Sequence, residues 1–207
     1  MLETLRHWIE PDWICLDLGA NMGTYMLAMS ALASKGEVHA FEPDPVLFND
    51  LRRTLLENEI DNVLLYQEVV GIDNIRGEFV EDPEWRSSSH FMPGGGPCAA
   101  RSIDSLGLDR VDLIKIDIEG SELDALAGAA DTIKRCNPLV LMEFNSFAFI
   151  HYRNIVPREA LAVIRRTFPE LRFFNRQTRQ VELLVDDEAF LRNNLLTGFV
   201  DDLICTN

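Results

Sequence analysis

Residues 16–23 read Leu-Asp-Leu-Gly-Ala-Asn-Met-Gly and follow an apolar run that begins at Trp13. The apolar run is typical of a buried parallel strand, and the glycines allow the chain to turn sharply where the strand ends. Ligands of open α/β sheets bind beyond the carboxyl ends of the strands. The turn after this strand is therefore predicted to be a ligand site.

The spacing of this turn, D-x-G-x-N-x-G, indicates which kind of ligand it takes. A phosphate-binding turn would read G-x-G-x-x-G, and the carboxylate of Asp17, just before the first glycine, would repel a pyrophosphate. The same carboxylate would suit the ammonium group and the sulfonium charge of S-adenosylmethionine. The alternative is a plain strand-to-helix turn that binds nothing.

The flanking sequence alternates short apolar runs with amphipathic segments, which indicates βαβ units. We therefore predict an α/β fold with a doubly wound, mostly parallel sheet flanked by helices, and antiparallel strands near the C-terminus. The predicted strands cover residues 13–18, 37–41, 62–67, 111–116, 139–144, 172–175, 181–185 and 202–206, and the predicted helices cover residues 24–34, 46–58, 121–135 and 157–167. No linker divides the sequence, so one domain over residues 1–207 is expected.

Residues 78–101 break this alternation. The segment contains Pro93-Gly-Gly-Gly-Pro97, and this much glycine and proline without a period favours an exposed loop. Long loops in compact domains are usually functional, so we interpret the segment as a substrate-facing loop. His90 lies within it and is a candidate general base, although an exposed histidine without a function is the simpler interpretation.

The net charge of −15, from 34 acidic residues against 19 lysines and arginines, limits the possible partners. Such a charge would repel nucleic acid and anionic membrane surfaces, so neither is expected as a partner. No apolar run approaches the roughly 20 residues of a membrane helix, and no secretory signal begins the sequence. We expect a cytoplasmic protein that acts on a small molecule or a glycan.

Glu42 ends the second predicted strand and is followed by Pro43-Asp44-Pro45. An acid at this place in an α/β sheet accepts hydrogen bonds from the ribose hydroxyls of an adenosine, a feature that NAD enzymes share. Together with the D-x-G-x-N-x-G turn, Glu42 favours S-adenosylmethionine. The alternative is that Glu42 only supports the start of the next helix, for which Asp44 is the predicted N-cap.

Two further strand ends carry carboxylates. Strand alternation places Lys115, Asp117 and Glu119 on one side of the chain, and Asp117 could meet the methionine part of the cofactor while Glu119 faces the substrate. Glu143 ends the neighbouring strand and is a candidate base, because methylation of a hydroxyl requires a proton acceptor. No metal site is predicted, although Asp117, Glu143 and Asn145 offer the oxygen ligands that Mg²⁺ prefers.

The runs DLGANMG, FEP, KIDIEGSE and LMEFN, in this order, resemble the FkbM-type methyltransferases, a branch of the class I methyltransferase fold. The resemblance spans roughly residues 12–145 and implies O-methylation of hydroxyls on sugars or natural products. It also implies that Glu68 and Val69 lie along the adenine, and that Asp117 and Glu119 face the reaction centre. The remaining cofactor-binding residues that it implies are Asp17, Gly19, Asn21, Gly23 and Glu42.

Two other functions stay open at this point. An NAD-dependent oxidoreductase would share Glu42, but the position of Asp17 and the missing first glycine count against it. A Rossmann-like module without catalysis would have a vestigial cofactor site and would bind a partner. Four intact motifs argue against a cofactor site that has lost its function. The sequence leaves open the acceptor, the choice between oxygen and nitrogen as its nucleophile, and the oligomeric state.

Overall fold

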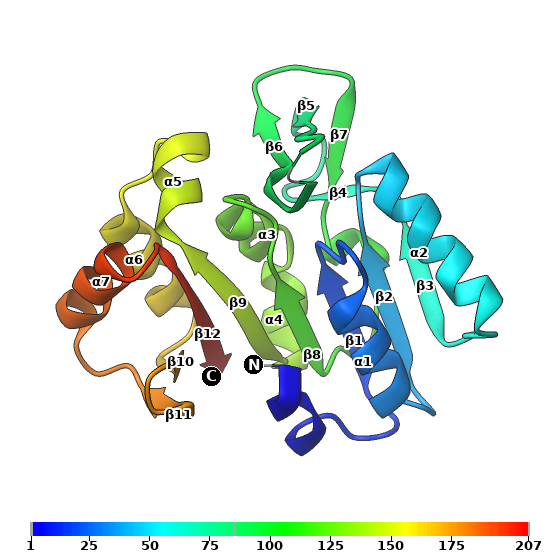
Figure 1. The fold of residues 1–207 in the computed structure, drawn as a ribbon, viewed down its shortest axis with the longest axis horizontal. Helices are drawn as coiled ribbons and strands as arrows, with labels where there is room; N and C mark the ends of the chain where they lie inside the picture. The colour runs from blue at the N-terminus through cyan, green and yellow to red at the C-terminus, as the bar shows by residue number, and fades with distance from the viewer. Residues whose placement is uncertain (1, 85, 207) are drawn as a thin grey trace.

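A computed structural model describes residues 2–84 and 86–206 and shows an α/β fold built on a mostly parallel sheet (Figure 1). The strands of this sheet are β1 (Ile14–Leu18), β2 (Glu37–Phe41), β3 (Val63–Tyr66), β8 (Leu113–Ile116), β9 (Leu139–Asn145), β10 (Glu170–Asn175), β11 (Gln180–Leu183) and β12 (Val200–Thr206). Within the described residues the strand order is β11-β10-β12-β9-β8-β1-β2-β3. Residues 1, 85 and 207 lie outside the described part.

The predicted fold class is confirmed. Strands β9, β8, β1, β2 and β3 pair in parallel, whereas β12, β10 and β11 are antiparallel additions at one edge. Figure 1 shows β12 running against β9. The C-terminal strands are therefore the antiparallel edge that the sequence predicts.

The helices differ more from the prediction. They are α1 (Thr24–Leu32), α2 (Pro45–Glu57), α3 (Glu122–Gly128), α4 (Ala130–Cys136), α5 (Ser146–Arg153), α6 (Pro157–Thr167) and α7 (Asp187–Leu196), with short 3-10 turns η1 (Leu2–His7), η2 (Arg86–Ser88) and η3 (Asp104–Leu106). The single helix predicted over residues 121–135 is two helices that meet at Ala129. Helices α5 and α7 were not predicted, and each begins at a residue whose side chain accepts a backbone N–H, Asn145 and Asp186 respectively.

Side-chain alternation along the central strands separates two apolar cores. Leu16 and Leu18 of β1 pack in one core with residues of helices α3 to α7. Cys15, on the other face of the same strand, packs in a second core with Met26 and Met29 of α1. Both faces of the sheet are therefore covered, as a parallel sheet requires.

The prediction of an irregular exposed loop over residues 78–101 is wrong. Strands β4 (Val69–Val70), β5 (Arg76–Val80), β6 (His90–Pro93) and β7 (Cys98–Arg101) form a second small sheet in the order β4-β7-β5-β6. The glycines that suggested a loop occupy the β6–β7 turn, where Gly94 and Gly95 have φ angles of 150° and 90°. Figure 1 shows this small sheet above the carboxyl-terminal end of β1.

Gly19 explains how two of the sequence motifs meet. Its φ angle is +82°, and a Cβ atom on it would lie 2.0 Å from the carbonyl oxygen of Asp117. Only glycine tolerates both the left-handed backbone and this close approach. The turn after β1 therefore packs directly on the loop after β8, which brings the D-x-G-x-N-x-G and KIDIEGSE runs to one place.

Candidate active site

The main pocket lies beyond the carboxyl ends of β1, β2, β3 and β8, and residues of the small sheet form its other wall. Its volume is about 620 Å³ when the open space at its mouth is counted. The residues of its wall that the sequence predicted as site residues are Gly19, Asn21, Glu42, Glu68, Val69, His90, Asp117 and Glu119.

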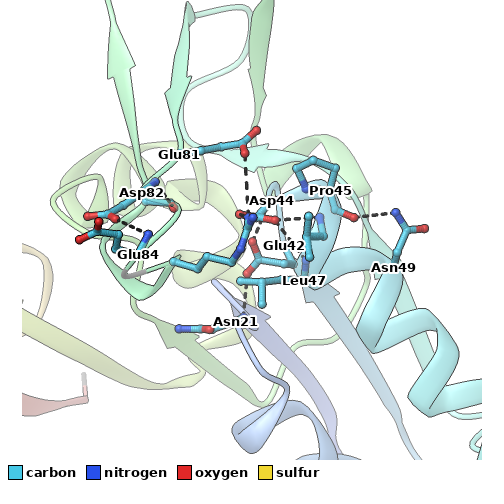
Figure 2. A network of polar contacts seen from close by, with 12 residues as sticks. Asn21, Glu42, Asp44, Pro45, Leu47, Asn49, Glu81, Asp82 and Glu84 are labelled. Atoms are coloured by element: carbon cyan, nitrogen blue, oxygen red, sulfur yellow. Dashed lines mark hydrogen bonds and ion pairs between the residues drawn. The ribbon is translucent and has the colours of Figure 1, made fainter.

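Glu42 is held by the backbone (Figure 2). Its Oε2 accepts the N–H of Asn21 at 2.7 Å, and its Oε1 accepts the N–H of Asp44 at 2.8 Å. Burial raises the pKa of Glu42, and the two backbone donors counteract this by favouring the charged form. Each oxygen accepts one such bond, so the carboxylate keeps acceptor capacity for two hydroxyls of a ligand.

Asp17 and Gly23 do not line the pocket. Asp17 is fully buried, and Lys115 lies between it and Asp117, with its Nζ 3.2 Å from Asp17 Oδ1 and 3.4 Å from Asp117 Oδ2. Burial opposes the charge of Lys115, but the two neighbouring carboxylates outweigh burial and raise its pKa. Asp17 therefore reaches the pocket only through Lys115, a residue to which the sequence prediction gave no role.

Gly23 is the N-cap residue of α1, with a φ angle of 84°. A Cβ atom added there would lie 2.6 Å from Leu51 of α2. The absence of a side chain at Gly23 therefore allows α1 to pack closely against Leu51 of α2, beside the pocket.

Carboxylates gather at the ends of β8 and β9. Asp117, Glu119 and Glu143 each bring an oxygen to a point where all three oxygens lie within 4.8 Å of one another. The amide nitrogen of Asn145 donates to Glu119 Oε2 at 3.3 Å and to Glu143 Oε2 at 3.2 Å. A single amide group thus donates to both Glu119 and Glu143. The arrangement therefore provides few hydrogen bonds to stabilise the charged forms of these two carboxylates.

The pKa values of these acids reflect that arrangement. Burial and the charges of Asp117 and Glu122 raise the pKa of Glu119 to about 8. Burial and the charges of Asp117 and Glu119 raise the pKa of Glu143 to about 9. A glutamate with a pKa near neutrality is suited to accept a proton from a substrate.

Only Glu119 of these two high-pKa glutamates lines the main pocket. Glu143 borders a smaller neighbouring pocket together with Tyr25 and Asp202. Glu122 is different again: it is fully buried, and its Oε1 accepts the N–H groups of Ile118 and Gly120. Glu122 therefore supports the loop that carries Glu119.

Two of the three residues considered for Mg²⁺, Asp117 and Glu143, bring their oxygens together with Glu119, whereas Asn145 points its oxygen elsewhere. Asn145 turns its amide nitrogen toward the acids, while its Oδ1 accepts the N–H of Ala148 and caps α5. In this arrangement Asn145 is a hydrogen-bond donor to the two carboxylates.

His90 lines the pocket from the small sheet. Its ring stacks on Tyr152 of α5 with the ring centroids 3.7 Å apart, and its Nδ1 lies 3.0 Å from the carbonyl oxygen of Ser88. The imidazole is therefore held between β6 and α5. Arg86, which also lines the pocket, was not predicted, because its partner Asp44 is distant in sequence.

No helix among the described residues is long and apolar enough to cross a membrane.

Comparisons with known proteins point to one family. The sequence profile described as the methyltransferase FkbM domain matches residues 17–177. The 2-O-methyltransferase NoeI of Sinorhizobium fredii is 24% identical over 90% of this chain and 82% of its own length. The hexuronic acid methyltransferase AglP of Haloferax volcanii is 26% identical over 70% of this chain and 62% of its own length.

Solved structures agree on the fold. The methyltransferase FkbM of Methylobacillus flagellatus superposes with a TM-score of 0.55 and 21% identity over 76% of this chain, which spans 37% of that larger protein. The Streptococcus mutans protein SMU.1697c, solved in complex with S-adenosylhomocysteine, superposes with a TM-score of 0.54 and 11% identity, covering 100% of this chain and 95% of its own. These likenesses establish a class I methyltransferase architecture.

Proposed function

The chain belongs to the FkbM family of methyltransferases, and we propose that it transfers a methyl group from S-adenosylmethionine to a hydroxyl of a small-molecule or glycan acceptor. One observation carries the proposal. A single pocket joins Glu42, whose carboxylate is held by backbone donors, to Glu119, whose burial and neighbours raise its pKa to about 8. Such a pocket has a place for a nucleoside at one end and a proton acceptor at the other.

The residues at the first end of the pocket fit an adenosine. Glu42 keeps acceptor capacity for the two ribose hydroxyls, and Asn21 and Gly19 line the same wall. We assign Glu68 and Val69 to the adenine edge of the pocket and Asp117 to the methionine end, where its charge complements an ammonium group. Asp17 acts indirectly in this proposal, since it holds Lys115 against Asp117.

S-adenosylmethionine, when bound, would supply a methyl group on a sulfonium that is already activated toward attack by a hydroxyl, and it would leave as S-adenosylhomocysteine when the carbon–sulfur bond breaks. The contribution of the protein is to position the acceptor and to take up its proton. We assign proton acceptance to Glu119: as the acceptor oxygen gains the methyl group, its O–H proton passes to a Glu119 carboxylate oxygen. Glu143 and His90 are the alternative acceptors of this proton.

The charge of the site limits the acceptor. Asp117 borders the proposed reaction centre, and the whole chain carries a net charge of −15. An anionic acceptor would be repelled by this field. We therefore favour a neutral hydroxyl compound for this chain.

Equilibrium binding followed by transfer of a labelled methyl group tests the function. By calorimetry we expect S-adenosylmethionine and S-adenosylhomocysteine to bind in the micromolar range, and NADH not to bind. Incubation with methyl-labelled S-adenosylmethionine and a panel of neutral sugars and natural-product alcohols should then label one acceptor class. Binding of NADH in place of S-adenosylhomocysteine would overturn the proposal, as would no binding of the cofactor at millimolar concentration.

A further inference from the structure

The segment that connects β5 to β6 forms part of the pocket rim. We call its described residues, 81–84 and 86–89, the rim segment. Arg86 and Ser89 of this segment line the main pocket, and so do Glu42, Pro43 and Leu47 from the β2–α2 region. Access to the nucleoside end of the pocket therefore depends on how the rim segment is held against the loop between β2 and α2.

A partly buried ion pair makes that connection. Arg86 Nη1 lies 2.5 Å from Asp44 Oδ2, and the Asp44 side chain is fully buried. The other oxygen of Asp44, Oδ1, accepts the N–H groups of Val46 and Leu47 at the start of α2. Asp44 thus has one oxygen committed to the helix and one committed to the rim segment.

Arg86 has a second acidic partner on its own segment. Glu81 Oε2 lies 3.9 Å from the same Nη1, and the side chain of Glu81 is 48% exposed. Figure 2 shows Glu81 and Asp44 facing each other, with Glu42 and Asn21 beyond Asp44. The guanidinium therefore lies between an acid that belongs to the α2 side of the pocket and an acid that would move with the rim segment.

We propose that the Arg86–Asp44 pair is a latch that holds the rim segment against the α2 side and slows the exit of the bound nucleoside. When the segment moves away, Arg86 leaves Asp44 and keeps Glu81 as its partner, which stabilises the open arrangement. Arg86 is then a positioning residue, and Glu81 opposes it. The proposal rests on the proposed function, because the ligand behind the latch is the cofactor.

The physical basis of the proposal is that Arg86 interacts more strongly with Asp44 than with Glu81. A hydrogen bond to a buried charge is among the stronger ones in proteins, whereas an exposed pair at 3.9 Å contributes little. The closed arrangement is therefore favoured, and Glu81 reduces that preference by a small amount. Removing Arg86 and removing the charge of Glu81 should change the release rate in opposite directions, which a general loss of stability would not produce.

The experiment measures dissociation of S-adenosylhomocysteine from the immobilised full chain by surface plasmon resonance. We expect Arg86→Gln to release the ligand about tenfold faster, as loss of a charged hydrogen bond predicts, and Arg86→Lys to restore part of the difference. We expect Glu81→Gln to release it about twofold more slowly, as loss of an exposed pair predicts. Thermal unfolding of each variant reports separately on folding.

Two matched variants serve as controls. Glu84→Gln removes a negative charge from the same segment, and Arg53→Gln removes an exposed guanidinium from α2, where it pairs with Asp50. Both should release the ligand at the wild-type rate. If Arg86→Gln does not fold, Glu81→Gln still tests the latch. Wild-type binding with release rates unchanged in folded Arg86→Gln, or in Glu81→Gln, would overturn the latch alone, whereas no wild-type binding would overturn the proposed function.

Discussion

The two ends of the pocket use the same kind of side chain in opposite ways. Glu42 and Glu119 are both buried or nearly so at strand ends, but Glu42 accepts two backbone N–H groups, whereas Glu119 shares one amide with Glu143. Fixed donors favour the charged form of an acid, and neighbouring acids disfavour it. The surroundings therefore suit Glu42 to bind neutral hydroxyls and Glu119 to take up a proton.

The largest expected effect comes from removing the carboxylate at the reactive end. Glu119→Gln keeps the shape and the contact with Asn145 but removes the proton acceptor. We expect kcat to fall by about 10²- to 10⁴-fold, the usual contribution of a general base, with the dissociation constant of S-adenosylhomocysteine changed less than about threefold. Steady-state kinetics and calorimetry on the same preparation measure the two quantities.

Glu143→Gln is the matched comparison, because Glu143 has a similarly raised pKa but borders the smaller pocket. We expect a smaller loss of kcat there than in Glu119→Gln. Glu159→Gln, on the exposed face of α6, should leave kcat unchanged. A greater loss in Glu143→Gln would transfer the role of proton acceptor to that residue.

The next effect concerns the binding end. In Glu42→Gln the Oε2 or Oε1 that accepts a backbone N–H is replaced by an NH₂ group, so a backbone donor loses its acceptor and the ribose loses a charged partner. We expect S-adenosylhomocysteine to bind about 30- to 100-fold more weakly, with kcat at saturating cofactor reduced much less. Calorimetry measures the first and saturation kinetics the second. Equal losses in affinity and in kcat would mean that the two ends are not separable.

The sequence predicts which strand ends meet at the pocket, because this follows from the sheet topology. Carboxyl ends of parallel strands meet at one edge, so Gly19, Glu42 and Asp117 could be placed around one pocket from strand boundaries alone. The partners that tune these acids could not be predicted in the same way. The hydrogen bond from Asn145 to Glu119 depends on how the chain turns after β8 ends, as the left-handed φ of 50° at Glu119 illustrates. The contacts of Lys115 with Asp17 and Asp117 depend on the register of β8 with β1, in which Lys115 lies opposite Asp17.

The small sheet shows a second reason why parts of the structure could not be predicted from the sequence. Glycine and proline mark a turn, but they do not distinguish a long loop from a short connection between two strands, and Gly94 and Gly95 lie in such a connection, between β6 and β7. The pairing of β5 with β6 rests on contacts such as Phe79 opposite Phe91, 12 positions apart along the chain. The pair of Arg86 with Asp44 spans 42 positions. Local patterns carry no signal for such contacts.

The dependence of kcat on pH is a smaller effect than those of the two substitutions, and it separates the two ends of the pocket without a mutation. If Glu119 takes up the proton, the active form is the carboxylate, whose pKa is raised to about 8 by burial and by Asp117 and Glu122. We expect kcat to rise about tenfold between pH 6.5 and 7.5 and to level off above pH 9. A midpoint near 6.5, the ordinary pKa of a histidine, would instead point to an imidazole as the acceptor.

The affinity for S-adenosylhomocysteine should change much less over this range, because two backbone donors favour the charged form of Glu42. The stability of the fold should change in the opposite direction to kcat. Glu119 and Glu143 have pKa values of about 8 and about 9 in the folded chain, against an ordinary value of 4.5, so the folded state holds more protons than the unfolded state between these limits. The free energy of unfolding should therefore fall as the pH rises from about 5 to 9, and Glu119→Gln should flatten that fall in urea titrations. A wild-type stability that increases over this interval would mean that cations or rearranged donors already compensate the acids, and that the contrast between the two ends is smaller than their contacts indicate.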